Sequence, residues 1–143
     1  MNADFPKPVI VVSKCLGFDH CRYDGEMIDA PLVDKLKARV TFLPVCPEVE
    51  SGLGVPRKPI RIVSAAGGRT LYQPATGKEF TRPMSDFVQA FLDSLPEVDG
   101  FLLKIRSPSC GLKDVKIHDG FEEGARTIKG SGFFGGAVLD RFA

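Results

Sequence analysis

Three of the four cysteines stand just after short apolar segments, and this placement is the sequence feature that most constrains the fold. The segments are residues 9–12, 40–45 and 100–105, which precede Cys15, Cys46 and Cys110. Short β-branched and apolar runs bounded by turn residues are typical of buried strands. Because the carboxyl ends of parallel strands meet at one edge of a sheet, we expect the three thiols to converge there. Structural cysteines would be expected inside the strands rather than just after them.

Helix signals lie between these runs. Asp29 offers an N-cap and Pro31 an early helical position to a short helix after the first run. Residues 81–95 place apolar side chains at helical spacing, and a last helix is predicted at residues 133–142. Two shorter strands are predicted around the glycine turn at residues 67–68. Strands that alternate with helices indicate an α/β fold.

The expected architecture is a single domain over residues 1–143, a Rossmann-like three-layer sandwich with a mainly parallel sheet and its site at the C-terminal strand ends. A chain of 143 residues, 43% hydrophobic and 26% charged, suits one soluble domain. Its net charge of +1 excludes a protein that wraps nucleic acid by bulk charge, although a local basic patch is compatible with it. The sequence shows no long apolar run and no leader signal, so we expect a cytoplasmic protein whose cysteines bind metal or react.

The cysteine spacing narrows the kind of metal site. The chain has no Cys-x2-Cys pair, which disfavours a zinc ribbon, a thioredoxin-type redox site and a ferredoxin-type cluster motif. Three scattered thiolates suit a 4Fe–4S cluster that keeps one iron available as a Lewis acid. A fourth ligand, Cys21, would close that position and give an electron carrier or a structural site. The residues alone leave three and four ligands both open.

Polar residues close to the thiols supply candidate catalytic groups. Glu48 stands two residues after Cys46, where a carboxylate could activate water; its alternative is an ordinary loop or capping glutamate. Ser107 and Ser109 supply hydroxyls just before Cys110, and their alternative is a plain Ser/Pro turn.

Two further segments need an interpretation. Arg22, Tyr23 and Asp24 place a planar cation, an aromatic ring and an acid beside Cys21, or else form an exposed turn with a salt bridge. Residues 130–135 formally match a dinucleotide fingerprint, but the sequence supplies neither the βαβ unit nor the acidic residue about twenty positions on that the fingerprint requires. We expect these glycines to allow a close approach to another segment and to begin the last helix.

Five motifs, in order along the chain, resemble those of the thiouracil desulfidase family, once catalogued as a domain of unknown function. They are Val12-Ser-Lys-Cys15, Cys21-Arg-Tyr-Asp-Gly25, Val45-Cys-Pro-Glu-Val49, Gly52-Leu-Gly-Val-Pro-Arg57 and Arg106-Ser-Pro-Ser-Cys-Gly111. The resemblance covers nearly the whole chain. Residues 54–63 and 76–81 look most like the desulfidase half of longer two-domain members, which are associated with removing sulfur from 4-thiouridine in RNA or nucleosides.

The resemblance implies a 4Fe–4S cluster ligated by three cysteines, carried over as Cys15, Cys46 and Cys110, with catalytic roles for Glu48 and Ser107. The residues expected to bind substrate are Arg22, Tyr23, Asp24, Lys104 and Ser109. The implied reaction is non-redox and hydrolytic. It removes sulfur from 4-thiouracil, 4-thiouridine or 4-thiouridine in tRNA and yields uracil or uridine and hydrogen sulfide. The expected partner is a thiolated nucleobase or nucleoside, with tRNA as a further candidate and no membrane.

Two other functions are compatible with the sequence. An iron–sulfur electron-transfer or sensing module would use all four cysteines as ligands. An RNA-interaction domain without turnover would need a phosphate-binding patch. The candidate patches are Arg57, Lys58 and Arg61, or Lys104, Arg106, Lys113 and Lys116. Desulfidation is the preferred hypothesis because it accounts for all five motifs.

Overall fold

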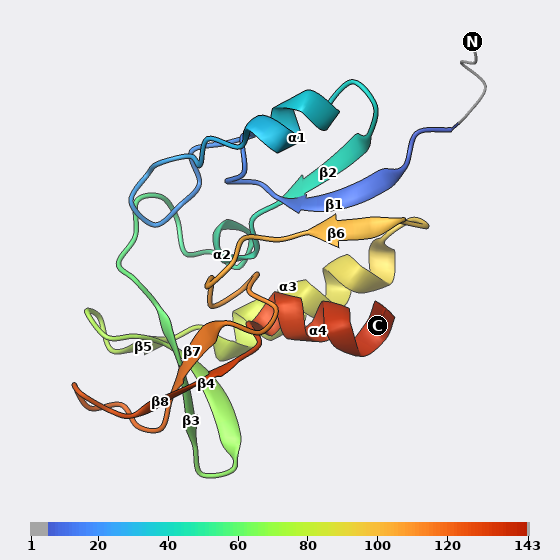
Figure 1. The fold of residues 1–143 in the computed structure, drawn as a ribbon. Helices are drawn as coiled ribbons and strands as arrows, with labels where there is room; N and C mark the ends of the chain where they lie inside the picture. Colours follow the sequence, from blue (N-terminus) through green and yellow to red (C-terminus); the bar gives the residue numbers. More distant parts are fainter. Residues whose placement is uncertain (1–5, 143) are drawn as a thin grey trace.

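A computed structural model describes residues 6–142 of the chain (Figure 1). The elements, in chain order, are β1 (Val9–Ser13), α1 (Pro31–Leu36), β2 (Thr41–Val45), α2 (Pro47–Glu50), β3 (Arg61–Ala65), β4 (Gly68–Gln73), β5 (Lys78–Glu79), α3 (Thr81–Ser94), β6 (Gly100–Leu102), β7 (Val115–His118), β8 (Thr127–Gly130) and α4 (Phe133–Phe142). Within residues 6–142, no helix is both long and apolar enough to cross a membrane.

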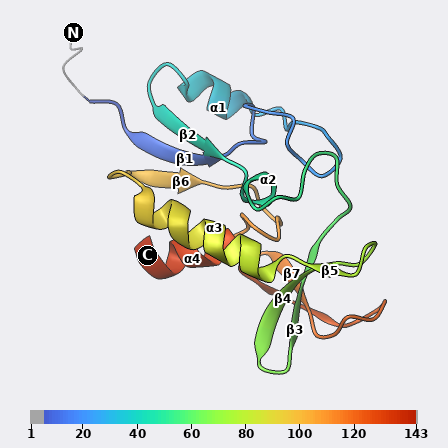
Figure 2. The ribbon, with the colours of Figure 1, turned by 180° about the vertical axis from the view of Figure 1, so that it is seen from behind.

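The strands that precede the three cysteines form one parallel sheet. Its order is β2-β1-β6, so β1 is the central strand. Helix α1 lies on one side of this sheet and helices α3 and α4 on the other, which gives three layers (Figures 1 and 2). Val11 and Val12 of β1 are both 0% exposed, as expected where helices cover both faces of a parallel sheet. The predicted α/β fold is confirmed.

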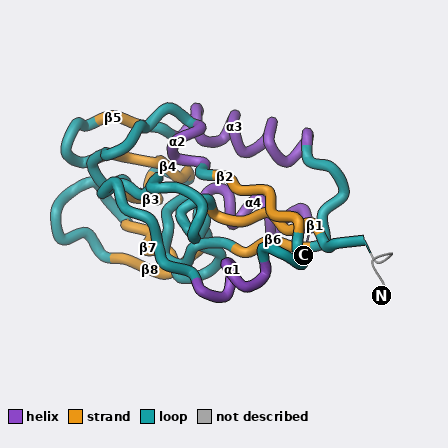
Figure 3. The backbone as a smooth tube through the Cα atoms, turned by 90° about the horizontal axis from the view of Figure 1, so that it is seen from above, coloured by secondary structure: helices purple, strands orange, loops and turns teal. Residues whose placement is uncertain are grey.

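A second sheet of five strands was not predicted. Its order is β5-β4-β3-β7-β8, and every pairing is antiparallel except β3 with β7. The β3–β4 hairpin contains the predicted glycine turn. Strands β7 and β8 have four residues each, which is too short for an alternating pattern to indicate a strand. The predicted mainly parallel sheet therefore describes the three-stranded sheet alone. Figure 3 shows the two sheets at opposite ends of the molecule.

The core joins the two long helices to both sheets. Its buried residues include Val11 and Val45 of the parallel sheet and Ile62, Leu71 and Ile117 of the second sheet. Met84, Val88 and Leu92 of α3 recur every four residues and are buried, as the helical spacing predicts. Phe134 of α4 is fully buried and makes edge-to-face contacts with the rings of Phe91 and Phe101, at centroid distances of 5.7 and 6.5 Å. These contacts fix α4 against α3 and β6, close to the ends of the strands.

Two element boundaries differ from the prediction. Helix α1 begins at Pro31 as expected, but its N-cap position is Ala30 without a side-chain hydrogen bond, so the proposed Asp29 cap is wrong. Strand β6 ends at Leu102 and does not reach residue 105. Beyond its end, the Lys104 N–H donates to a side-chain acceptor on β1, Ser13 Oγ, at 2.8 Å.

Candidate functional site

A cavity of about 910 Å³ lies between the carboxyl ends of the parallel strands and the second sheet. One wall consists of residues 13–15, 45–48 and 104–110, which follow β1, β2 and β6. The facing wall includes side chains of β3, β7 and β8. All four cysteines line this cavity, so the fold brings together thiols that are up to 95 positions apart, from Cys15 to Cys110.

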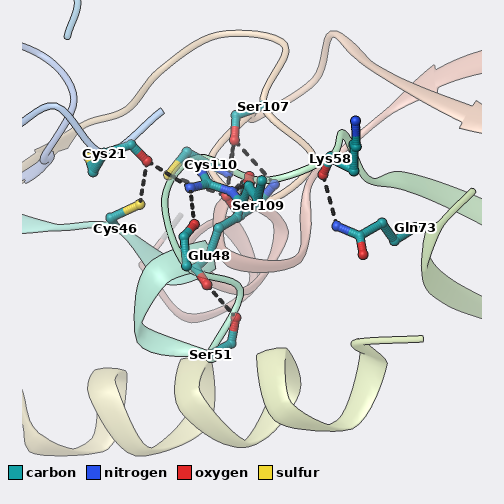
Figure 4. A network of polar contacts seen from close by, with 11 residues as sticks. Cys21, Cys46, Glu48, Ser51, Lys58, Gln73, Ser107, Ser109 and Cys110 are labelled. Atoms are coloured by element: carbon teal, nitrogen blue, oxygen red, sulfur yellow. Dashed lines mark hydrogen bonds and ion pairs between the residues drawn. The ribbon is translucent and has the colours of Figure 1, made fainter. Parts of the chain in front are cut away.

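Three of the thiols, Cys15, Cys21 and Cys46, lie close to one another. The Cys46 thiol donates to the Cys21 carbonyl oxygen at 3.7 Å (Figure 4). The neighbouring Cys21 thiol lowers the pKa of Cys15, whereas Cys15 raises the pKa of Cys21 to about 11. The Cys21 thiol and burial raise the pKa of Cys46.

Cys110, like Cys21, is buried, with 4% of the residue exposed. Burial raises its pKa to about 12, although hydrogen bonds with Ser13 and Ser109 act in the opposite direction. Protonated thiols must lose their protons to bind iron, so metal binding at this cavity releases protons.

The thiols suit a cluster better than a single ion. Among residues 6–142, no group of three or more His, Cys, Asp or Glu side chains could hold one metal ion. A single ion draws all its thiolates to within about 2.3 Å of one point. A cluster instead binds each thiolate to a different iron, so its ligands stand around a cavity. The four cysteines are free thiols around one cavity and fit that requirement.

Helix α2 places Glu48 at the wall of the cavity, two residues after Cys46. Pro47 begins the helix directly after Cys46, a position for which its fixed φ is suited. The Glu48 residue is only 8% exposed. Its Oε1 accepts from Arg57 Nε at 2.9 Å and its Oε2 accepts from Ser109 Oγ at 3.0 Å. Glu48 is therefore a buried, ion-paired carboxylate at the cavity wall, and not an ordinary loop or capping glutamate.

The serine turn before Cys110 is a directional hydrogen-bond chain (Figure 4). Ser107 Oγ accepts from the backbone N–H groups of Ser109 and Cys110, at 3.2 and 3.0 Å. A hydroxyl has two acceptor sites and one proton, so Ser107 donates to Ser109 Oγ, 3.0 Å away. Ser109 in turn donates to Glu48. The chain thus runs from Ser107 through Ser109 to the carboxylate.

The first turn of α4 holds the serine turn in place. Its backbone N–H groups, which have no partner within a helix, donate to carbonyls of the turn at 2.8–3.0 Å: Gly132 to Gly111, Phe133 to Pro108, and Phe134 and Gly135 to Ser109. A Cβ atom on Gly132 would lie 2.5 Å from the Ser109 carbonyl oxygen, and one on Gly135 would overlap the Gly111 carbonyl oxygen. The predicted close approach at these glycines is confirmed.

We expect Gly135→Ala to lower the free energy of unfolding by about 1–3 kcal/mol, the usual cost of overpacking. The added methyl group meets backbone rather than a movable side chain, so the Cys110 turn must shift. Urea unfolding of the purified variant measures the effect. Gly68→Ala is the matched control, because nothing lies within 4 Å of a Cβ atom there. Equal midpoints for Gly135→Ala and the wild type would contradict the close contact.

The predicted substrate-binding residues do not all reach the cavity. Arg22, Tyr23, Lys104 and Ser109 line it, whereas Asp24 does not. Asp24 accepts from the Glu26 N–H at 3.0 Å and pairs with Arg22 at 3.5 Å, as in the salt-bridged turn that was the alternative interpretation. Lys104 Nζ donates to the Ile105 carbonyl at 2.7 Å.

Several cavity residues were not assigned to the site from the sequence. The second sheet contributes Arg61, Lys116, His118 and Lys129. Neither predicted phosphate patch forms as a unit at the cavity, because Lys58 and Lys113 are not among the lining residues. Arg57, a member of the first patch, is engaged with Glu48. The sequence signal that could have assigned Arg57 to the site was its position at the end of the fourth family motif, residues 52–57.

Together, the fold and the cavity define a class of α/β protein whose thiol-lined site lies at the carboxyl edge of a parallel sheet. The sequence model of one family, 2-thiouracil desulfurase, matches residues 10–143. The chain belongs to the 2-thiouracil desulfurase family. The resemblance seen in the five motifs is confirmed.

Two individual proteins are similar to this chain over most of its length. The uncharacterized protein YbbK of Bacillus subtilis (strain 168) is 31% identical over 131 residues, which are 87% of this chain and 85% of YbbK. A solved structure, that of the 4Fe–4S-dependent thiouracil desulfidase TudS, is similar with a TM-score of 0.67 and 31% identity. The similarity covers 94% of this chain and 86% of the TudS chain.

Proposed function

We propose that this protein is a 4Fe–4S-dependent desulfidase that hydrolyses the C–S bond of a thiolated uracil. The observation that carries the proposal is the meeting of strand-end thiols and a buried carboxylate at one cavity. The family match and the similarity to TudS, a 4Fe–4S-dependent thiouracil desulfidase, support it. The reaction balances without electron transfer: thiouracil and water give uracil and hydrogen sulfide.

Cys15, Cys46 and Cys110 are the proposed cluster ligands, each from the end of a different strand. When bound on three thiolates, the cluster supplies one iron as a Lewis acid for the thiocarbonyl sulfur. Cys21 stays a thiol in this proposal, because a fourth thiolate would occupy that iron. Cys21 lies next to both Cys15 and Cys46 and shifts the pKa of each.

Glu48 is the proposed general base, which takes a proton from the water that attacks the thiocarbonyl carbon. A carboxylate has about four acceptor sites. Arg57 and Ser109 each take one of them, so the carboxylate retains acceptor capacity at the cavity wall. Ser107 and Ser109 hold the second carboxylate oxygen in place through their hydrogen-bond chain. Ser107, which lines the cavity, is proposed to act through this chain, because its proton and both acceptor sites are already used within the turn.

Arg22, Tyr23 and Lys104 are proposed to bind the uracil ring, and Asp24 to orient Arg22 from outside the cavity. A cavity of about 910 Å³ is within the usual range for small-molecule sites and can hold a nucleobase or a nucleoside. We propose these two substrate classes, and thiolated tRNA as a third. We also propose that residues 1–143 act as one desulfidase domain in the cytoplasm, since free thiols persist in a reducing compartment.

Anaerobic reconstitution followed by substrate assays tests this function. We expect sulfide release and matching uracil or uridine formation from 4-thiouracil, 4-thiouridine or thiolated tRNA, in proportion to the cluster content. The apoprotein is the control and should release no sulfide. A fully loaded protein that releases none from any substrate would overturn the proposal. Salt-dependent RNA binding without turnover would then favour the RNA-interaction domain, and reversible reduction would favour the electron carrier.

A further inference from the structure

Arg57 connects three parts of the site through one buried guanidinium group. Its side chain is 5% exposed. Nε donates to Glu48 Oε1 at 2.9 Å, while Nη1 donates to the carbonyl oxygens of Cys21 and Gly54, both also at 2.9 Å. The Arg57 backbone N–H donates to the Tyr23 carbonyl at 2.7 Å. The residue thus joins α2, the loop at 21–25 and the loop at 52–57.

The loop after α2 has the conformation that this arrangement requires. Gly52 and Gly54 have φ values of 99° and 78°, in the left-handed region that side chains with a Cβ atom rarely adopt. These two glycines reverse the chain direction, so that a residue nine positions after Glu48 returns to its carboxylate.

The contacts of Arg57 distinguish it from the other cations of the cavity. Arg22 and Lys104 also line the cavity, but their side chains are exposed or half-exposed. Arg22 forms an ion pair with Asp24, and Lys104 donates to a backbone carbonyl. Arg57 instead directs three hydrogen bonds of its fork into the protein, and its charge is compensated by Glu48. It is built into the wall and does not serve as a docking point for an anionic substrate.

We propose that Arg57 is a positioning residue for Glu48: it fixes the carboxylate plane so that the remaining acceptor sites meet the attacking water. This inference rests on the proposed function. A planar fork is required for the task, because one nitrogen must reach Glu48 while another reaches two carbonyl oxygens. Lysine keeps the charge but cannot reproduce that geometry.

A double-mutant cycle on kcat tests whether Arg57 acts through Glu48. The variants are Arg57→Lys, Glu48→Gln and the combination, each loaded with cluster to the wild-type iron content. We expect Arg57→Lys to lower kcat by about 10²-fold, the order of loss caused by a misplacement of about 1 Å. KM should stay within about threefold, because the backbone bond to Tyr23 that holds the substrate loop is retained. In the Glu48→Gln background, Arg57→Lys should cause no further loss.

If the fold-losses in kcat of the two single variants multiply in the double variant, the inference is overturned, because Arg57 would then act independently of Glu48. A loaded wild-type protein without sulfide release would overturn the proposed function instead, and the inference with it. Arg82→Lys is the matched control, since Arg82 forms only an exposed pair with Asp86 at 3.9 Å, and its kcat should equal that of the wild type.

Urea unfolding of the apoproteins provides a readout that is independent of activity. Arg57→Gln leaves the Glu48 carboxylate buried without its cation, so its unfolding midpoint should fall. The double variant with Glu48→Gln removes both charges, and its midpoint should lie above that of Arg57→Gln. A double variant that is less stable than Arg57→Gln would show that the two side chains are not a coupled pair.

Discussion

Alanine in place of Cys15, Cys46 or Cys110 should abolish the visible absorption of the reconstituted cluster in each single variant. The three thiols come from the ends of three different strands, and the fourth cysteine, Cys21, is proposed to stay a thiol. A cluster that needs three protein ligands is then held by two and is lost to solvent or oxygen. Iron and sulfide analysis after anaerobic reconstitution, with the absorption spectrum, measures the loss.

Cys21→Ala is the matched control for this series. It removes a buried thiol in contact with two of the proposed ligands, yet cluster content and sulfide release should both stay near the wild-type level. Normal cluster occupancy in all three ligand variants would contradict the assignment. If Cys21→Ala instead loses iron as completely as Cys15→Ala, the cluster has four thiolate ligands. That result would favour the electron-carrier function over the desulfidase.

Glu48→Gln should lower the rate of sulfide release by about 10²- to 10⁴-fold, the usual contribution of general acid–base catalysis. Glutamine keeps the size of the side chain and one acceptor oxygen for Arg57, so the cavity wall changes little. Cluster content and thiouracil affinity should therefore stay close to those of the wild type, while proton transfer from water is lost. Initial rates and a spectral titration with substrate, at equal iron content, separate these effects.

Glu50→Gln is the control for this change, because Glu50 lies on the same short helix but is exposed and does not line the cavity. It should leave the rate unchanged. Near-normal sulfide release by loaded Glu48→Gln would show that another group activates water. Asp114 would then be the next candidate, as the other carboxylate among the described residues that line the cavity.

The parts of the molecule that could be predicted are those in which neighbouring residues determine the structure. The β-branched runs correctly predicted the strands before Cys15 and Cys46. The recurrence of apolar side chains every four residues correctly predicted helix α3. The convergence of the cysteines followed from a general property of parallel sheets. Nothing beyond these local patterns was needed to bring the thiols to one cavity.

The parts that could not be predicted depend on loops and on pairing between distant segments. The second sheet is formed by strands as short as two residues, for which a period-2 pattern is uninformative. The Glu48–Arg57 pair depends on two left-handed glycines between the partners, which local sequence does not distinguish from an ordinary flexible loop. Asp24 was expected at the substrate, and the salt bridge with Arg22 accounts for its place outside the cavity.

The contact between α4 and the Cys110 turn has a consequence for biosynthesis. The carbonyl groups of the turn receive their donors from residues 132–135, more than twenty positions after Cys110. The turn that fixes Cys110 therefore forms only after residues 132–135 have been translated and have folded against it. A cluster that uses Cys110 is accordingly expected to be inserted after α4 has been translated.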